Sequence, residues 1–130
     1  MKTLTIRDES MTGQLLKELL INIETEAITV ADLIKARVHT EVRQYNTNKQ
    51  LVYNGLVQPV SAERVLNGYK IKKGTVIDPE KQTYIALDAF QRNGFFMLVD
   101  DYQVGDLQEE ILVEADTRVS FVRLTPLVGG

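Results

Sequence analysis

The chain closes with the segment Phe121-Val122-Arg123-Leu124-Thr125-Pro126-Leu127-Val128-Gly129-Gly130. Together with Val119 before it, Phe121 alternates with residues that face the other way, which predicts a final strand with one buried side. Pro126 fixes φ and lacks a backbone N–H, so it favours leaving the sheet for an extended tail. At an average glycine usage of about 7%, roughly 0.5% of chains carry glycine at two given positions. Whether this ending has a function therefore depends on the residues before it.

Composition indicates one soluble globular domain. The 130 residues are 25% charged and 44% hydrophobic, with a formal net charge of -3. This mildly acidic balance offers no electrostatic surface for nucleic acid or an anionic membrane. No apolar run approaches the ~18 residues of a membrane span, and the first residues lack the apolar core of a signal peptide. We therefore expect a cytoplasmic protein that binds neither nucleic acid nor membrane.

The residue inventory argues against an enzyme. The sequence has no cysteine, so any thioester or persulfide chemistry must use the cysteine of a partner. His39 is the single histidine, and it falls beside an apolar helical stripe, where we expect it to face solvent. No nucleophile-elbow or phosphate-binding glycine motif accompanies it. We expect no catalytic residue, no cofactor and no metal site.

Two strands and a helix are predicted for the first part of the chain. Leu4 and Ile6 alternate with polar residues, which indicates a half-buried strand, and residues 8–13 have the composition of a turn. Residues 15–23 change from helical spacing to alternation, and we favour a strand that pairs with the first. Thr29 is then a good N-cap, with Asp32 in the capping-box position. The helix should end near residues 46–48, and its apolar positions form a stripe at helical spacing: Ile34, Val38, Val42 and Tyr45.

The middle of the chain is less regular. Leu51-Val52-Tyr53 before Asn54-Gly55 indicates a short strand that enters a tight turn. Residues 61–66 are predicted as a short helical stretch, closed by Asn67-Gly68. Residues 70–74 carry a small basic patch, which we interpret as a solvated loop.

A second helix and the remaining strands follow. Asp78 is placed as an N-cap and Pro79 as the first helical residue, with a stop at Asn93-Gly94. The continuous apolar run at residues 95–99 predicts a central strand. Residues 105–110 then predict a turn or a single helical turn, before two shorter alternating runs lead to the final strand.

Acidic residues near these turns have simple explanations. Asp100, Asp101 and Asp106 suggest a hard-metal site only superficially, because their spacing matches no calcium loop. A solvated turn is the favoured interpretation. Glu109 and Glu110 are adjacent residues on a turn, and nothing in the sequence suggests that they form a catalytic pair.

Two parts of the sequence carry a resemblance to a known family. Residues 104–107, 117–121 and 126–130 are similar to the end of ubiquitin-like and sulfur-carrier proteins, whose last strand runs through a short apolar tail to Gly-Gly. Residues 28–34 resemble the strand-to-helix passage of the same proteins. The resemblance implies an α+β fold of the β-grasp type, in which a helix crosses a mixed sheet. It covers residues 1–46 and 95–130.

The intervening segment sets this chain apart from the minimal fold. We expect a domain at residues 1–124 with an insertion at about 47–94 that contains the second helix, followed by a flexible tail at 125–130. Such an insertion resembles bacterial ubiquitin-like proteins that act with activating and conjugating enzymes. Sulfur carriers are usually more compact, which favours a protein modifier.

The resemblance implies that the tail is the part on which other proteins act. Gly130 would supply the carboxylate that an activating enzyme adenylates, with a conjugating enzyme, an isopeptidase and target proteins as further partners. The tail would be recognised through the residues that lead to it, namely Gly129, Val128, Leu127, Pro126 and Leu124. Two alternatives remain open: a sulfur carrier with a C-terminal thiocarboxylate, and a non-covalent β-grasp adaptor.

Overall fold

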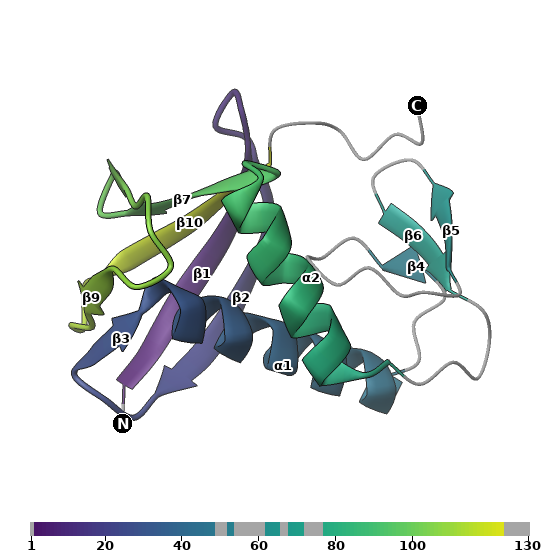
Figure 1. The fold of residues 1–130 in the computed structure, drawn as a ribbon, viewed down its shortest axis with the longest axis horizontal. Coiled ribbons are helices and arrows are strands. Elements are labelled where there is room, and N and C mark those ends of the chain that lie inside the picture. Colours follow the sequence, from purple (N-terminus) through teal and green to yellow (C-terminus); the bar gives the residue numbers. More distant parts are fainter. Residues whose placement is uncertain (1, 49–51, 54–61, 66–67, 72–76, 124–130) are drawn as a thin grey trace.

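The computed structural model describes residues 2–48, 52–53, 62–65, 68–71 and 77–123 (Figure 1). These residues form an α+β arrangement with a mixed five-stranded sheet, two helices, and two smaller sheets. The elements follow in the order β1 (Lys2–Ser10), β2 (Leu15–Ile23), β3 (Ala27–Thr29), α1 (Val30–Asn48), β4 (Val52–Tyr53), β5 (Ala62–Val65), β6 (Gly68–Ile71), α2 (Pro79–Gln91), β7 (Phe95–Val99), β8 (Tyr102–Gln103), β9 (Glu110–Leu112) and β10 (Arg118–Arg123). The predicted α+β class is confirmed.

The main sheet is built around the first and last strands. Its order is β2-β1-β10-β7-β8, and β1 runs parallel to β10 while the other neighbours are antiparallel. Ile6 pairs with Leu19 on one side and with Val119 on the other, and all three are buried. Both helices cover the same face of this sheet (Figure 1). The predicted final strand therefore lies inside the sheet rather than at its edge.

Helix α1 follows its sequence signals closely. The Oγ1 atom of Thr29 accepts a hydrogen bond from the Asp32 N–H at 3.1 Å, which confirms the predicted N-cap. The helix ends at Asn48, within the predicted limits. All four residues of the predicted stripe are buried against the sheet or α2: Ile34, Val38, Val42 and Tyr45.

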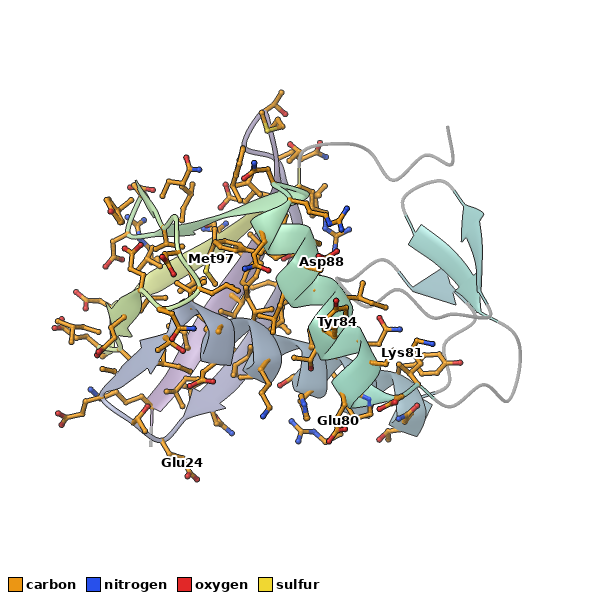
Figure 2. The ribbon with its side chains drawn as sticks, viewed as in Figure 1. Glu24, Glu80, Lys81, Tyr84, Asp88 and Met97 are labelled. Carbon is orange, nitrogen blue, oxygen red and sulfur yellow. The ribbon has the colours of Figure 1, made fainter. Side chains whose placement is uncertain are left out.

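Helix α2 also begins and ends where the sequence predicts. The Oδ1 atom of Asp78 accepts from the Glu80 N–H at 3.0 Å, Pro79 occupies the first turn, and Asn93 leaves the helix with a left-handed φ of 61°. Figure 2 shows Tyr84 and Asp88 on the outward side of α2. The inward side buries Gln82, Ala86 and Phe90.

The second helix belongs to the same core as the main sheet. The Phe90 ring lies 5.7 Å from that of Phe95 on β7, and Phe95 lies 5.5 Å from Phe121 on β10. Met97, labelled in Figure 2, is fully buried in this core. The segment predicted as an insertion thus supplies a structural part of the hydrophobic core.

Two predictions in the middle of the chain are wrong. Residues 62–65 form strand β5 and not a helix, since they pair with β6 in an antiparallel register from Ala62↔Ile71 to Val65↔Gly68. Tertiary pairing here overrides the helical preference of the sequence Ala-Glu-Arg. Lys70 and Ile71, predicted as loop, belong to β6 and also join this small sheet, in which β4 pairs with β6.

The first turn is also shorter than predicted. Residues 8–10 continue β1, because the strand pairs with β10 as far as Ser10↔Arg123. The reversal begins at Met11 and uses Gly13, which has a φ of 87° and donates its N–H to the Ser10 carbonyl at 3.0 Å. Asp8, which the sequence predicted in the turn, therefore lies in β1, and its side chain is buried.

The remaining strands form a small separate ladder. β3 pairs with β9 in an antiparallel register centred on Ile28↔Ile111. The backbone carbonyls of Leu107 and Glu109 accept hydrogen bonds from Ala31 and Val30 at 2.9 Å each, which joins this region to the start of α1. Among the described helices, none is long and apolar enough to cross a membrane.

Candidate functional site

The residues predicted to form the functional site are at the end of the chain. Described residues end at Arg123. The predicted conjugation residue Gly130 and the predicted recognition residues Gly129, Val128, Leu127, Pro126 and Leu124 therefore lie outside them. What the structure describes is Arg123, the residue that precedes this segment in the sequence.

Arg123 is held by the two strands that flank β10 in the sheet. Arg123, the last residue of β10, pairs with Ser10 of β1 and with Phe95 of β7. The strand before it is anchored by Val119 and Phe121, which are fully buried. The position of the last described residue is thus fixed by two neighbouring strands.

A buried group of charged side chains lies beneath this position. We call it the tail-root cluster, and it comprises Asp8 of β1, Arg37 and Glu41 of α1, and Arg123 of β10. Arg123 Nη2 donates to Asp8 Oδ2 at 3.0 Å. Arg37 donates to both Asp8 oxygens, through Nη1 to Oδ1 and through Nη2 to Oδ2 at 2.6 Å. Arg37 also donates to Glu41 Oε1 from Nε at 3.2 Å and from Nη2 at 2.8 Å.

These charges are almost completely removed from water. The side chains of Asp8, Arg37 and Glu41 are 0% exposed, and that of Arg123 is 12% exposed. The Arg37 guanidinium also lies over the Phe121 ring, 4.6 Å from its centroid. Burial on this scale is tolerable only because each charge has opposite charges and hydrogen-bond partners around it.

The cluster shifts the titration of its members. Burial by itself would raise the pKa of the Asp8 carboxyl, but the hydrogen bonds and charge of Arg37 and the charge of Arg123 outweigh it and lower the pKa. Burial would likewise lower the pKa of Arg37, but Glu41 and Asp8 raise it above its usual value. Lys17 on β2 has a lowered pKa, because burial outweighs the attraction of Glu41 and Asp8.

The arrangement is suited to holding structure rather than to proton transfer. Both Asp8 oxygens accept from guanidinium groups and the side chain is 0% exposed, so this carboxylate remains ionised and is out of reach of a substrate. The cluster instead links β1, α1 and β10 at one point. We interpret it as the anchor of the segment that continues beyond Arg123.

Sequence reasoning missed this cluster although a signal was present. Arg37 and Glu41 lie one position before Val38 and Val42, on the same inner face of α1. Asp8 continues the inward alternation of Leu4 and Ile6 along β1. The helical period of α1 and the two-residue period of β1 are enough to place all three charged side chains inward.

Other residues considered from the sequence have local roles. His39 was expected to face solvent, but it is half-buried on α1, and its Nε2 atom is buried with no hydrogen-bond partner among the described residues. Asp100 and Asp101 form the turn between β7 and β8, with φ of 49° and 69°. Asp106 Oδ1 accepts from the Gln108 N–H at 2.7 Å.

The acidic side chains of these turns do not lie together at one place. The described residues contain no group of three or more side chains that would hold a metal ion. Glu109 Oε1 accepts from the Gly105 N–H at 3.2 Å, while Glu110 is exposed on β9. Asp100, Asp101, Asp106 and Glu109 lie in turns, as the sequence predicts, whereas Glu110, also predicted in a turn, is the first residue of β9 and pairs with Thr29.

Comparisons with protein-family models, with curated proteins and with solved structures each gave no match to this chain.

Proposed function

We propose that this chain is a β-grasp protein of the ubiquitin-like class and acts as a protein modifier through its C-terminal glycine. The strand order supports the fold part of the proposal. A β1–β2 hairpin precedes a helix packed across the sheet, and the last strand lies parallel to the first at the centre. The sequence resemblance predicts this arrangement for residues 1–46 and 95–130.

The observation that carries the proposal is the anchoring of β10 directly before the Gly-Gly segment. The central strand and the tail-root cluster fix Arg123, and residues 124–130 follow it. A fully extended chain spans about 3.3–3.6 Å per residue, so a segment of this length can reach at most roughly 23–25 Å. A rigid domain that presents a short glycine-ended segment is what a modifying enzyme needs in order to thread that end into an active site.

The proposed chemistry acts on the carboxylate of Gly130. This carboxylate has a reference pKa of about 3.5 and does not acylate amines without activation. An activating enzyme directs a carboxylate oxygen at the α-phosphorus of ATP, which forms the acyl-adenylate and releases pyrophosphate. A cysteine thiolate of the enzyme then displaces AMP, and the thioester passes to a conjugating enzyme and finally to a lysine amine of a target.

Gly129 and Gly130 suit this chemistry because they lack a Cβ. A narrow channel admits them, and they adopt backbone angles closed to other residues. Leu124, Leu127 and Val128 would provide apolar contacts for recognition, and the fixed φ of Pro126 favours an extended chain. An isopeptidase that recognises the same residues would reverse the modification.

Mass spectrometry of the intact chain tests the proposal. We would incubate the full chain with ATP, magnesium and a candidate adenylating enzyme, then add hydroxylamine as an amine acceptor or sulfide as a sulfur donor. We expect ATP-dependent pyrophosphate exchange and a hydroxamate mass. A thiocarboxylate mass formed only in the presence of sulfide would instead identify a sulfur carrier.

Two variants make the test specific to the tail. Deletion of Gly130 should abolish exchange while thermal stability stays unchanged, and Arg118→Ala, at an exposed position on the same strand, should leave exchange intact. If neither exchange nor a mass change occurs with adenylating enzymes that act on other Gly-Gly proteins, the covalent function is rejected. The non-covalent adaptor then becomes the better account.

A further inference from the structure

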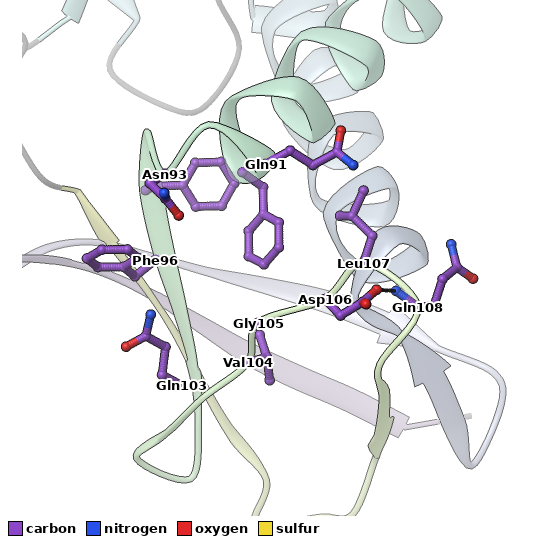
Figure 3. Close-up of a pocket in the computed structure, with 11 residues that line it drawn as sticks. Gln91, Asn93, Phe96, Gln103, Val104, Gly105, Asp106, Leu107 and Gln108 are labelled. Carbon is purple, nitrogen blue, oxygen red and sulfur yellow. Dashed lines mark hydrogen bonds between the residues drawn. The ribbon is translucent and has the colours of Figure 1, made fainter.

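A second feature of the fold is a cleft on the opposite side of β7 from β10. It has a volume of about 400 Å³ and lies between the end of α2, the start of β7 and the loop after β8 (Figure 3). Its floor includes the buried side chains of Phe90, Phe95 and Val104. Its rim carries four exposed amide side chains: Gln91, Asn93, Gln103 and Gln108.

One edge of this cleft is a strand that is only half paired. The Asp100 N–H donates to the Arg118 carbonyl at 2.9 Å, so even-numbered residues of β7 direct their backbone groups towards β10. Odd-numbered residues therefore point the other way, and the Met97 carbonyl accepts from the Val104 N–H at 3.1 Å. Phe95 is the next odd residue, and its N–H and C=O face the cleft.

The chain turns away before it can pair with Phe95. Strand β8 pairs only with Leu98 and Val99. After Val104, the Leu107 carbonyl is held by the Ala31 N–H at the start of α1, which draws the loop off the sheet. The alternation along β7 directs the backbone N–H and C=O of Phe95 away from β10, and among the described residues β8 does not extend far enough to pair with them. An unpaired strand edge beside a hollow is a template for another extended chain.

We propose that this cleft binds an extended, uncharged peptide segment of a partner protein. The peptide adds a short strand at Phe95 and exchanges backbone hydrogen bonds with its N–H and C=O. An apolar side chain of the peptide rests on the floor formed by Phe90 and Val104. The rim amides both donate and accept, so they complete the hydrogen bonds of a neutral backbone on either side.

The charge of the lining selects against other ligands. Among the described residues that line the cleft there is no lysine or arginine, so these residues offer no counter-charge for a phosphate or an acidic peptide. Asp106 is the one charged residue in the described part of the lining, and its Oδ1 already accepts from the Gln108 N–H. A neutral strand is therefore the ligand whose groups match those of the site.

Gly105 provides a way to close the cleft without disturbing the fold. It lines the cleft, and a Cβ placed on it meets no heavy atom within 4 Å. Gly105→Phe should therefore fold normally and fill the space. Leu112→Phe is the matched control, because it places the same ring at an exposed position on β9. Equal melting temperatures of both variants and the natural chain would verify that any lost binding is local.

The experiment selects short random peptides displayed on phage against the full chain and measures the affinity of a synthetic peptide from the selection. We expect binding that is at least about tenfold weaker to Gly105→Phe and unchanged to Leu112→Phe. N-methylation of alternate peptide amides should weaken binding only at those that face β7. In hydrogen exchange measured by NMR, the Phe95 amide should become protected when the peptide is added.

Several results would overturn the proposal. They are a selection that enriches no peptide, a peptide that binds Gly105→Phe as well as the natural chain, or binding that N-methylation at every position leaves unchanged. A chain truncated after Arg123 provides a further test. If truncation alone exposes the Phe95 amide to exchange, the occupant of the cleft is residues 124–130 and not a partner protein.

Discussion

The two helices cover the same face of the sheet but bury different kinds of side chain. Helix α1 buries the ion pairs of Arg37 and Glu41 among its apolar residues, and these charges reach Asp8 on β1. Helix α2 buries Ala86 and Phe90 with a single neutral polar side chain, Gln82. Apolar packing tolerates small shifts, whereas a bidentate ion pair requires one geometry. We infer that α1 fixes the register of the central strands, while α2 mainly completes the core.

The largest expected effect comes from removing the central charge of α1. Arg37→Met keeps much of the side-chain volume but leaves the carboxylates of Asp8 and Glu41 buried beside each other. Breaking a buried ion pair in this way costs about 3–5 kcal/mol. Urea denaturation should show this loss, and Arg118→Met, at an arginine whose side chain is 68% exposed, should stay within about 0.5 kcal/mol of the natural chain. Equal losses in both variants would contradict the role of the cluster.

A compensated variant sharpens the same comparison. Combining Arg37→Met with Asp8→Val and Glu41→Leu replaces the three fully buried ions by apolar side chains and leaves Arg123, whose side chain is 12% exposed, as the remaining charge of the cluster. Such replacements are often neutral or stabilising. We expect the triple variant to recover most of the stability that Arg37→Met loses. If the triple variant were as unstable as Arg37→Met, the charges would stabilise the fold by more than neutralising one another.

The corresponding test on α2 is Phe90→Ala. This change removes a ring packed 5.7 Å from Phe95 and leaves a cavity between helix and sheet. Large-to-small changes of this kind cost about 3–5 kcal/mol for a phenylalanine, and we expect the low end because Phe90 is 8% exposed. Tyr84→Ala, on the same helix at 73% exposure, is the matched control and should change stability by less than about 0.5 kcal/mol. Comparable losses would mean that α2 packs through its outward side.

The contrast between the helices also explains what the sequence predicts well and what it does not. The stripe of α1, the caps at Thr29 and Asp78 and the strand at 95–99 are local patterns, and each is found where predicted. The tail-root cluster depends on β1 and β10 being neighbours across more than a hundred residues. Asp8 looks like a turn residue until a strand from the far end of the sequence supplies Arg123.

The same physical reason accounts for the half-open edge of β7. The continuous apolar run at residues 95–99 predicts that β7 is a strand, but it does not reveal that β8 ends after two residues. The end of β8 depends on the hydrogen bond from the Ala31 N–H to the Leu107 carbonyl, which joins the following loop to the start of α1. Sequence patterns also predicted a helix where residues 62–65 form a strand, because the local helical preference is weaker than the pairing with β6.

The pH dependence of stability tests the buried ion pair between Asp8 of β1 and Arg37 of α1. The pKa of Asp8 is lowered in the folded state, so its contribution is fully present above the unfolded value of about 3.9 and is lost as pH falls through the folded value. Asp8→Asn lacks this contribution. Thermal melts in acid should therefore show the natural chain and Asp8→Asn converging as the pH falls below about 4. Parallel curves across that range would mean that Asp8 titrates normally.

The smallest predicted effect concerns the start of α1. Thr29→Ala removes the hydrogen bond from Thr29 Oγ1 to the Asp32 N–H, and loss of an N-cap costs about 1 kcal/mol. Strand pairing with Glu110 keeps the backbone of Thr29 in place, so the loss should be confined to this bond. Thr29→Ser retains the hydroxyl and should recover most of the stability in urea denaturation. If the serine variant is as unstable as the alanine variant, the methyl group of Thr29 and not its oxygen secures the start of the helix.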